Sequence, residues 1–175
     1  MALTTETEGL VRLASSDLDA LWRLIGDGST DPAEALHDVL PAVVTQYGEM
    51  GSAVAADWYD DERARRAVAG RFAAIPTPAS DRGAHALVGW ALKEAKDDVG
   101  LRELILGGTQ RRIADHVRQT VAESSARDPR ARGWERVGRN ECDWCDQFIG
   151  IVTTTPGYDF PAHDFCRCSV TPVWL

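Results

Sequence analysis

The chain has 175 residues, of which 44% are hydrophobic and 26% charged, and a formal net charge of −8 at pH 7. This size and composition indicate a globular protein, either one domain with an appendage or two small units, and exclude a disordered or fibrous chain. No apolar run approaches the roughly 18 residues of a membrane span, and the N-terminal stretch lacks the basic start and apolar core of a secretory signal. We therefore expect folding in a reducing cytosol and no contact with a membrane.

The charges are unevenly distributed along the sequence. Residues 1–60 carry a net charge of −9, residues 61–127 one of +3 and residues 128–175 one of −2. Because acidic surfaces repel phosphate backbones, we expect no nucleic-acid binding through the acidic N-terminal part. The middle third contains an RARR segment that could form a basic face, but acids at helical spacing favour local ion pairs there.

The N-terminal part is predicted to be helical. A short helix is expected over residues 16–26, with Ser16 as its N-cap and a glycine at its end. Asp31, followed by a proline, then starts a long second helix that we place at about residues 31–69. Its apolar residues recur at intervals of three and four and form one stripe: Leu36, Leu40, Val43, Tyr47, Met50, Val54 and Trp58.

The predicted length of this second helix leaves two interpretations open. A straight helix over residues 31–69 would be nearly 60 Å long, whereas a compact chain of this size has a radius of gyration of about 16 Å. The helix is therefore either bent, for example at Pro41, and packed in its own domain, or it projects and binds a partner. We prefer the first because long apolar stripes usually face a core. The second would make four stripe residues the candidate partner-binding surface: Leu40, Tyr47, Val54 and Trp58.

Further helices are predicted at about residues 81–96 and 100–125, the latter with a possible interruption at Gly107 and Gly108. From residue 128 onward, glycine, threonine, proline and aromatic residues replace alanine and leucine. The segments GWERVG, GIVTTT and CRCSVTPVW there are typical of short strands. The predicted fold is thus mainly α with a small C-terminal α+β unit, organised as a helical domain over 1–127 and a mini-domain with an antiparallel sheet over 128–175.

All four cysteines and one of the four histidines lie within residues 142–168. Their order is C-x2-C, then H-x2-C-x-C. Two donors three residues apart can approach one ion from a tight turn, and thiolate with imidazole suits zinc better than calcium or magnesium. We therefore predict a structural zinc site that clamps the mini-domain. The candidate ligands are Cys142, Cys145, His163 and Cys166, with Cys168 as the alternate fourth donor.

Three other interpretations of the cysteines remain open. Disulfides or redox-labile thiols would need an oxidising environment, which a particle outside the cell could provide. A thiol nucleophile with a histidine base, and buried cysteines without a ligand, are the other two. The sequence contains no HExxH, phosphate-binding GxxxxGK[ST], GxSxG or dinucleotide-binding motif, and we predict no catalytic residue.

The segment ARGWERVGRNECDWCDQFIGIV, together with FPAHDFCRCSVTPVW, is similar to the C-terminal motif of the phage head morphogenesis proteins, the Mu F-like minor capsid family. In that family a C-x2-C pair follows a tryptophan-bearing strand, here with Trp134, and an H-x2-C-R-C signature closes the domain. The upstream segments QYGEMGSAVAADWYDDERA and RQTVAESSARDPRARGW resemble members from tailed phages of actinobacterial hosts. The specific match covers about residues 110–174.

The resemblance implies a structural and assembly protein of a tailed-phage head. Such a minor capsid protein is made in the host cytoplasm, enters the procapsid beside portal, major capsid or scaffold protein, and stays in the head interior of the virion. Similar proteins are often described as capsid maturation proteases, which is the alternative function, although no catalytic constellation is recognisable. A zinc-stabilised adaptor for nucleic acid is a second alternative, which the acidic N-terminal part disfavours.

Overall fold

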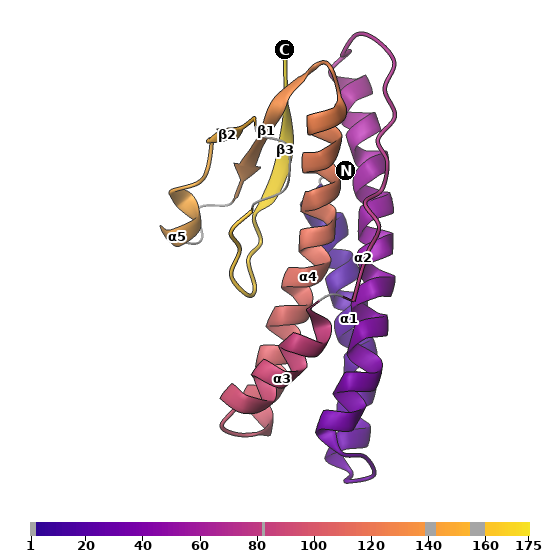
Figure 1. Ribbon diagram of the computed structural model, residues 1–175, viewed down its shortest axis with the longest axis vertical. Coiled ribbons are helices and arrows are strands. Elements are labelled where there is room, and N and C mark those ends of the chain that lie inside the picture. The colour runs from indigo at the N-terminus through magenta and orange to yellow at the C-terminus, as the bar shows by residue number, and fades with distance from the viewer. Residues whose placement is uncertain (1–2, 82, 139–142, 155–159) are drawn as a thin grey trace.

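The computed structural model describes residues 3–81, 83–138, 143–154 and 160–175. The described chain is mostly helical and ends in a three-stranded antiparallel sheet, which confirms the predicted fold class (Figure 1). No described helix is both long and apolar enough to cross a membrane. The elements are α1 (Leu3–Gly26), α2 (Pro32–Arg65), α3 (Ala84–Glu94), α4 (Asp98–Arg127), β1 (Ala131–Val137), α5 (Asp143–Asp146), β2 (Val152–Thr153) and β3 (Ser169–Trp174).

Helix α1 begins at Leu3, well before Ser16, so the predicted short helix is wrong about the start. Leu10, Leu18 and Leu21 are buried on one face of α1, and this stripe holds the whole helix against the bundle. In the sequence, threonine and serine residues interrupt this apolar stripe and make it hard to recognise. In the structure the Thr7 hydroxyl donates to the Leu3 carbonyl one turn earlier, at 2.9 Å, so it does not break the helix.

Helix α2 starts as predicted, because the Asp31 carboxylate accepts a hydrogen bond from the Glu34 N–H at 3.0 Å and Pro32 occupies the first turn. It ends at Arg65 and continues through Pro41 as one helix of 34 residues, about 51 Å long. Helices α1, α2 and α4 run beside one another along the long axis of the molecule (Figure 1). The long helix α2 therefore packs along its neighbours without a break at Pro41.

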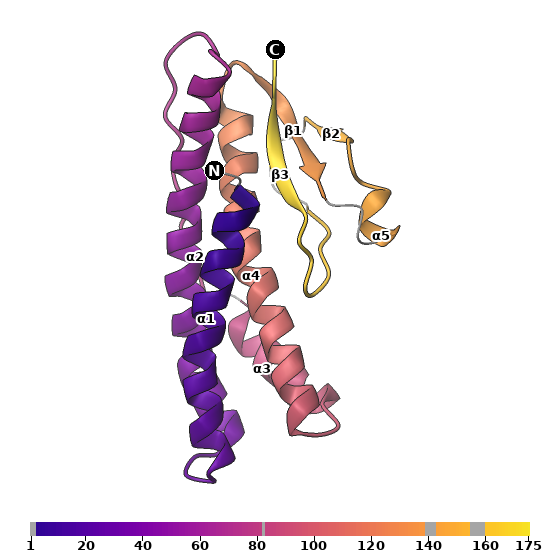
Figure 2. The same cartoon turned by 180° about the vertical axis from the view of Figure 1, so that it is seen from behind.

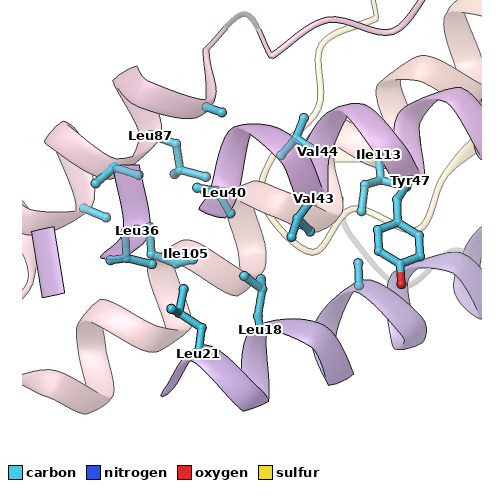
Figure 3. Packing of buried hydrophobic residues seen from close by; sticks show 14 of the residues in the cluster. Leu18, Leu21, Leu36, Leu40, Val43, Val44, Tyr47, Leu87, Ile105 and Ile113 are labelled. Atoms are coloured by element: carbon cyan, nitrogen blue, oxygen red, sulfur yellow. The ribbon is translucent and has the colours of Figure 1, made fainter. Parts of the chain in front are cut away.

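Most of the apolar stripe of α2 packs inside its own chain, although Met50 is 42% exposed. Leu40 is fully buried and Tyr47 is 6% exposed, so these two are core residues and not a surface for a partner (Figure 3). The Tyr47 hydroxyl donates to Asp17 of α1 at 2.6 Å, and this hydrogen bond, with burial, raises the pKa of Tyr47 to about 12. Val54 and Trp58 are partly buried against the second core, and their role in partner binding stays a prediction.

Helix α4 runs without interruption through Gly107 and Gly108. A Cβ at Gly108 would lie 2.4 Å from a methyl group of Leu87, and one at Gly107 would lie 2.7 Å from the Phe165 ring. The two glycines therefore serve close packing: α3 crosses α4 at Gly108, and the segment before β3 rests on α4 at Gly107.

The sheet has the order β2-β1-β3, with β1 antiparallel to both neighbours, and confirms the three predicted strands. Gly133 sits beside an irregularity of β1 with φ 144°, where a Cβ would lie 2.2 Å from the Thr153 carbonyl oxygen. Only glycine fits so close an approach of two strands.

Two hydrophobic cores hold the molecule together. The first lies among the four long helices, where Leu18, Leu36, Leu87 and Ile105 meet (Figure 3). The second joins α2 and the second half of α4 to the sheet, which lies beside α4 in both views (Figure 2). It combines helix residues with sheet and loop residues: Leu3, Ala55, Tyr59, Val117, Val121, Ala122, Trp134, Cys145, Phe160, Ala162, Cys166 and Val170. The division into a helical domain over 1–127 and a mini-domain over 128–175 stays a prediction.

Candidate metal centre

Three cysteine thiols come together where α5 meets the segment before β3. The sulfur atoms of Cys145, Cys166 and Cys168 all lie within 4.8 Å of one another, and the first two are buried. Cys142, the first cysteine of the predicted set, lies outside the described residues. Cys168, predicted as the alternate donor, thus stands beside Cys145 and Cys166 in a group close enough to hold one metal ion.

The spacing of the sulfurs distinguishes a shared ion from a disulfide. Cys145 Sγ and Cys166 Sγ are 3.8 Å apart. A disulfide requires about 2.05 Å, whereas two thiolates bound at about 2.3 Å to a tetrahedral zinc ion are about 3.8 Å from each other. The distance between these two sulfurs therefore fits ligands of one tetrahedral ion.

His163 lies beside this group with its ring oriented as a ligand. Its Nδ1 is 2.6 Å from the carbonyl oxygen of Asp164. Because a carbonyl only accepts, Nδ1 carries a proton, which leaves Nε2 as the ring nitrogen that could bind a metal. Nε2 lies 3.4 Å from Cys145 Sγ, close to the about 3.6 Å between an imidazole and a thiolate on one zinc ion. Metal-bound histidines are commonly fixed by such a hydrogen bond from the other ring nitrogen.

The turn that links His163 to Cys166 has the predicted tight geometry. The Cys166 N–H donates to the His163 carbonyl at 3.1 Å. Within the turn Phe165 has φ 60°, a left-handed conformation that a bulky residue rarely adopts, and its ring rests against Gly107 of α4. The turn is thus held in place by packing on the helix as well as by its own hydrogen bond.

The electrostatics at Cys168 favour its thiol form when no metal is bound. Burial raises the pKa of Cys168 above its ordinary value, and the charge of Cys166 adds to this rise. The positive charge of Arg136 acts in the opposite direction. Since a metal binds the thiolate, a bound cation would draw the proton from Cys168 and stabilise the charged form in its buried surroundings.

Arg118 of α4 binds the backbone of the cysteine segment. Its Nη2 donates to the carbonyls of Cys166 and Cys168 at 2.9 and 2.8 Å, and its Nε donates to the Cys168 carbonyl at 3.0 Å. Its Nη1 donates to Asp115 at 2.9 Å, and the residue is 2% exposed. No pattern in the sequence indicates this role, because the contact joins residues 50 positions apart.

Arg136 of β1 is the second buried cation at the site, 3% exposed. It donates to the Pro161 carbonyl, and its guanidinium lies over the rings of Phe160 and Phe148, 3.7 and 5.0 Å from their centres. Its Nη1 is buried and has no hydrogen-bond partner among the described residues. In the sequence, Arg136 lies two residues after Trp134. Side chains two residues apart on a strand lie on the same face, so this spacing could have indicated that Arg136 points inward.

These residues suit a structural metal centre. The donors are soft, two of the three thiols are buried, and the surroundings supply cations and carbonyl contacts that hold the ligand segments in place. A bound ion would cross-link α5 to the segment before β3. Cys145, Cys166 and Cys168, with His163 or Cys142, are the residues that would hold it.

Comparison with known proteins identifies the family. No curated protein and no solved structure matches the chain at a significant level. The family model of the VG15 protein matches residues 1–175, which is the whole chain. The chain therefore belongs to the VG15 protein family, a family of phage proteins.

Proposed function

We propose that this protein is a structural and assembly component of a tailed-phage head, a minor capsid protein that enters the procapsid in the host cytoplasm and remains in the head interior. The observation that carries the proposal is membership of a phage protein family over the whole chain. The similarity of the cysteine and histidine signature to Mu F-like head morphogenesis proteins supports the finer role. The partners are the portal or major capsid protein, with scaffold protein as a third candidate.

The proposed cofactor is a structural zinc ion. The 3.8 Å distance between two thiols and the orientation of His163 support a tetrahedral ion of this kind. The second core is small, and metal binding worth on the order of 10 kcal/mol would stabilise the sheet and its loops strongly. A bound zinc ion would hold α5 to the segment before β3 and so stabilise the loops of the C-terminal sheet during assembly.

Co-expression with the other head proteins of the same phage tests the proposal. The full chain is produced with major capsid, portal and scaffold protein, and particles are separated by sedimentation and analysed by mass spectrometry. We expect the chain in washed procapsids and, when it is expressed alone, only at the top of the gradient. Its absence from procapsids would contradict the proposal. Capsid or scaffold protein that is trimmed only when the chain is present would favour the protease alternative.

A further inference from the structure

Arg136 is a buried cation that lacks an acidic partner in the described part of the chain. Six other arginines form ion pairs there, but no described carboxylate pairs with Arg136. Its contacts are one carbonyl oxygen and two aromatic faces, and one of its nitrogens has no partner among the described residues. A buried guanidinium without a counter-charge is costly, so its surroundings are expected to contain an anion.

The cysteine group supplies that anion once it binds a metal. Arg136 pairs with Val170 in the sheet, which places it beside the strand that leads out of Cys168. Three thiolates and a neutral imidazole around a doubly charged ion carry a net charge of −1, and four thiolates carry −2. A metal-bound group would therefore provide the counter-charge that Arg136 lacks.

Arg118 holds the backbone of the cysteine segment in place, and this matters more than its charge. Its own charge is balanced by Asp115, whereas two of its nitrogens bind the carbonyls of Cys166 and Cys168. In an extended segment, the carbonyl groups of residues two apart point in the same direction. One guanidinium can therefore bind the carbonyls of Cys166 and Cys168 together, and this contact fixes the positions of the two thiols relative to each other. This contact also fastens the cysteine segment to α4.

We propose that two buried arginines complete the metal centre: Arg136 is the counter-ion of the metal–thiolate group, and Arg118 is a positioning residue that fixes the Cys166–Cys168 segment on α4. The inference rests on the metal site proposed above and is independent of the role in head assembly.

Zinc affinity of the full chain, measured by competition with a chromogenic chelator, tests both roles. We expect Arg136→Met to weaken zinc binding by about 10- to 100-fold, and Arg136→Lys to restore most of it, because an ammonium keeps the charge. Both Arg118→Met and Arg118→Lys should weaken binding, since a single ammonium lacks the planar fork that spans two carbonyls. The charge-transfer and d–d absorption bands of bound Co²⁺ should change for the Arg118 variants, which alter the ligand geometry.

Arg63 provides the matched control, because it is also buried but pairs with Asp128 and not with the cysteine segment. Arg63→Lys should lower the unfolding midpoint and leave zinc affinity unchanged. Circular dichroism checks that each variant is folded, and Arg136→Gln replaces the methionine variant if that one unfolds.

Four results would overturn the inference in part or in full. If the uncharged Arg136 variant binds zinc as tightly as the wild type, or the lysine variant as weakly as the uncharged one, the counter-ion role is wrong. Full affinity in Arg118→Lys would refute the positioning role. A wild-type chain that binds neither Zn²⁺ nor Co²⁺ would refute the metal site and this inference together, while incorporation into procapsids would still test the head-assembly role separately.

Discussion

At the scale of single residues, Gly48 determines how closely α2 approaches α4. A Cβ at this position would lie 2.5 Å from Cδ2 of His116 and 3.1 Å from the Ala79 methyl group. We expect Gly48→Ala to lower the free energy of unfolding by about 1–3 kcal/mol, because the partly buried His116 ring would have to move. Urea denaturation measures the change.

Gly89 in α3 is the control for that substitution. A Cβ there meets no atom within 4 Å, and the residue lies inside a helix. Gly89→Ala should therefore raise stability by up to about 1 kcal/mol through helix propensity alone. If both alanine variants change stability alike, the close approach at Gly48 does not limit the packing of the two helices.

His116 itself makes stability depend on pH. Burial lowers the pKa of His116 below its ordinary value of 6.5, although Asp115 acts in the opposite direction. The unfolded chain therefore takes up this proton at a higher pH than the folded chain, and stability falls as the pH drops through 6.5 toward the lower folded value. The slope cannot exceed about 1.4 kcal/mol per pH unit for one proton.

His116→Gln removes that titration and tests its contribution. Between pH 7.5 and 5.5 the wild-type free energy of unfolding should fall more steeply than that of the variant, and the two profiles should run parallel above pH 7.5. Equal slopes in the acidic range would show that His116 does not carry the dependence. Comparing slopes removes any constant effect of the substitution on packing.

The residues of the candidate site differ in how well the sequence predicts them. Cys145, Cys166 and Cys168, which the structure brings together, could be recognised as candidate ligands because donor types and spacing lie within one short segment, whereas His163 and Cys142 as ligands stay predictions. Arg118 could not, since its partners are backbone carbonyls that only the tertiary fold brings to α4. The grouping of Cys168 with Cys145 also depends on how α5 packs against the segment before β3, which local spacing does not determine.

At the scale of elements, a buried ion pair joins the end of α2 to the turn between α4 and β1. The Arg63 guanidinium donates to Asp128 at 2.9 Å and to the carbonyls of residues 68–70, and the Asp128 side chain is fully buried. The Tyr59 hydroxyl, whose pKa burial raises above its ordinary value, also donates to Asp128. The Asp128 carboxylate thus connects α2 to the turn between α4 and β1, and Arg63 adds the segment that follows α2.

Asp128→Asn should destabilise the fold by about 3–5 kcal/mol, because it leaves the Arg63 charge buried without its partner. The control is Asp19→Asn, which breaks the ion pair with Arg102, where both side chains are 48% exposed. That change should cost less than about 1 kcal/mol. Thermal unfolding of the two variants measures both losses of stability. Similar losses would contradict the claim that the buried ion pair stabilises the fold more than the exposed one.

The elements themselves follow from the sequence where one local signal dominates. The start of α2 and the three strands could be predicted from capping residues and alternation, and they are confirmed. The start of α1 was missed because threonine and serine weaken its apolar pattern, although their hydroxyls bond back to the helix. The continuity of α4 through its glycine pair could not be predicted, because the reason for those glycines is a contact with α3 and with Phe165.

At the scale of the whole molecule, the sheet is fastened to the helices in two ways. The second core packs apolar residues of the sheet on α2 and α4, and Arg118 binds the cysteine segment to α4 by hydrogen bonds. A metal ion at the cysteine group would in addition tie α5 to the segment before β3 and so stabilise the loops of the sheet. The account of a metal-stabilised sheet depends on that ion, whereas the proposed role in head assembly does not.

Metal analysis of the full chain, purified without chelators from zinc-supplemented cells, tests this claim most directly. We expect about one zinc ion per chain in the wild type, and close to none in the double variant Cys145→Ser with Cys166→Ser, because two of the grouped thiols are lost. A wild-type chain that is folded but contains no more zinc than this variant would contradict the account.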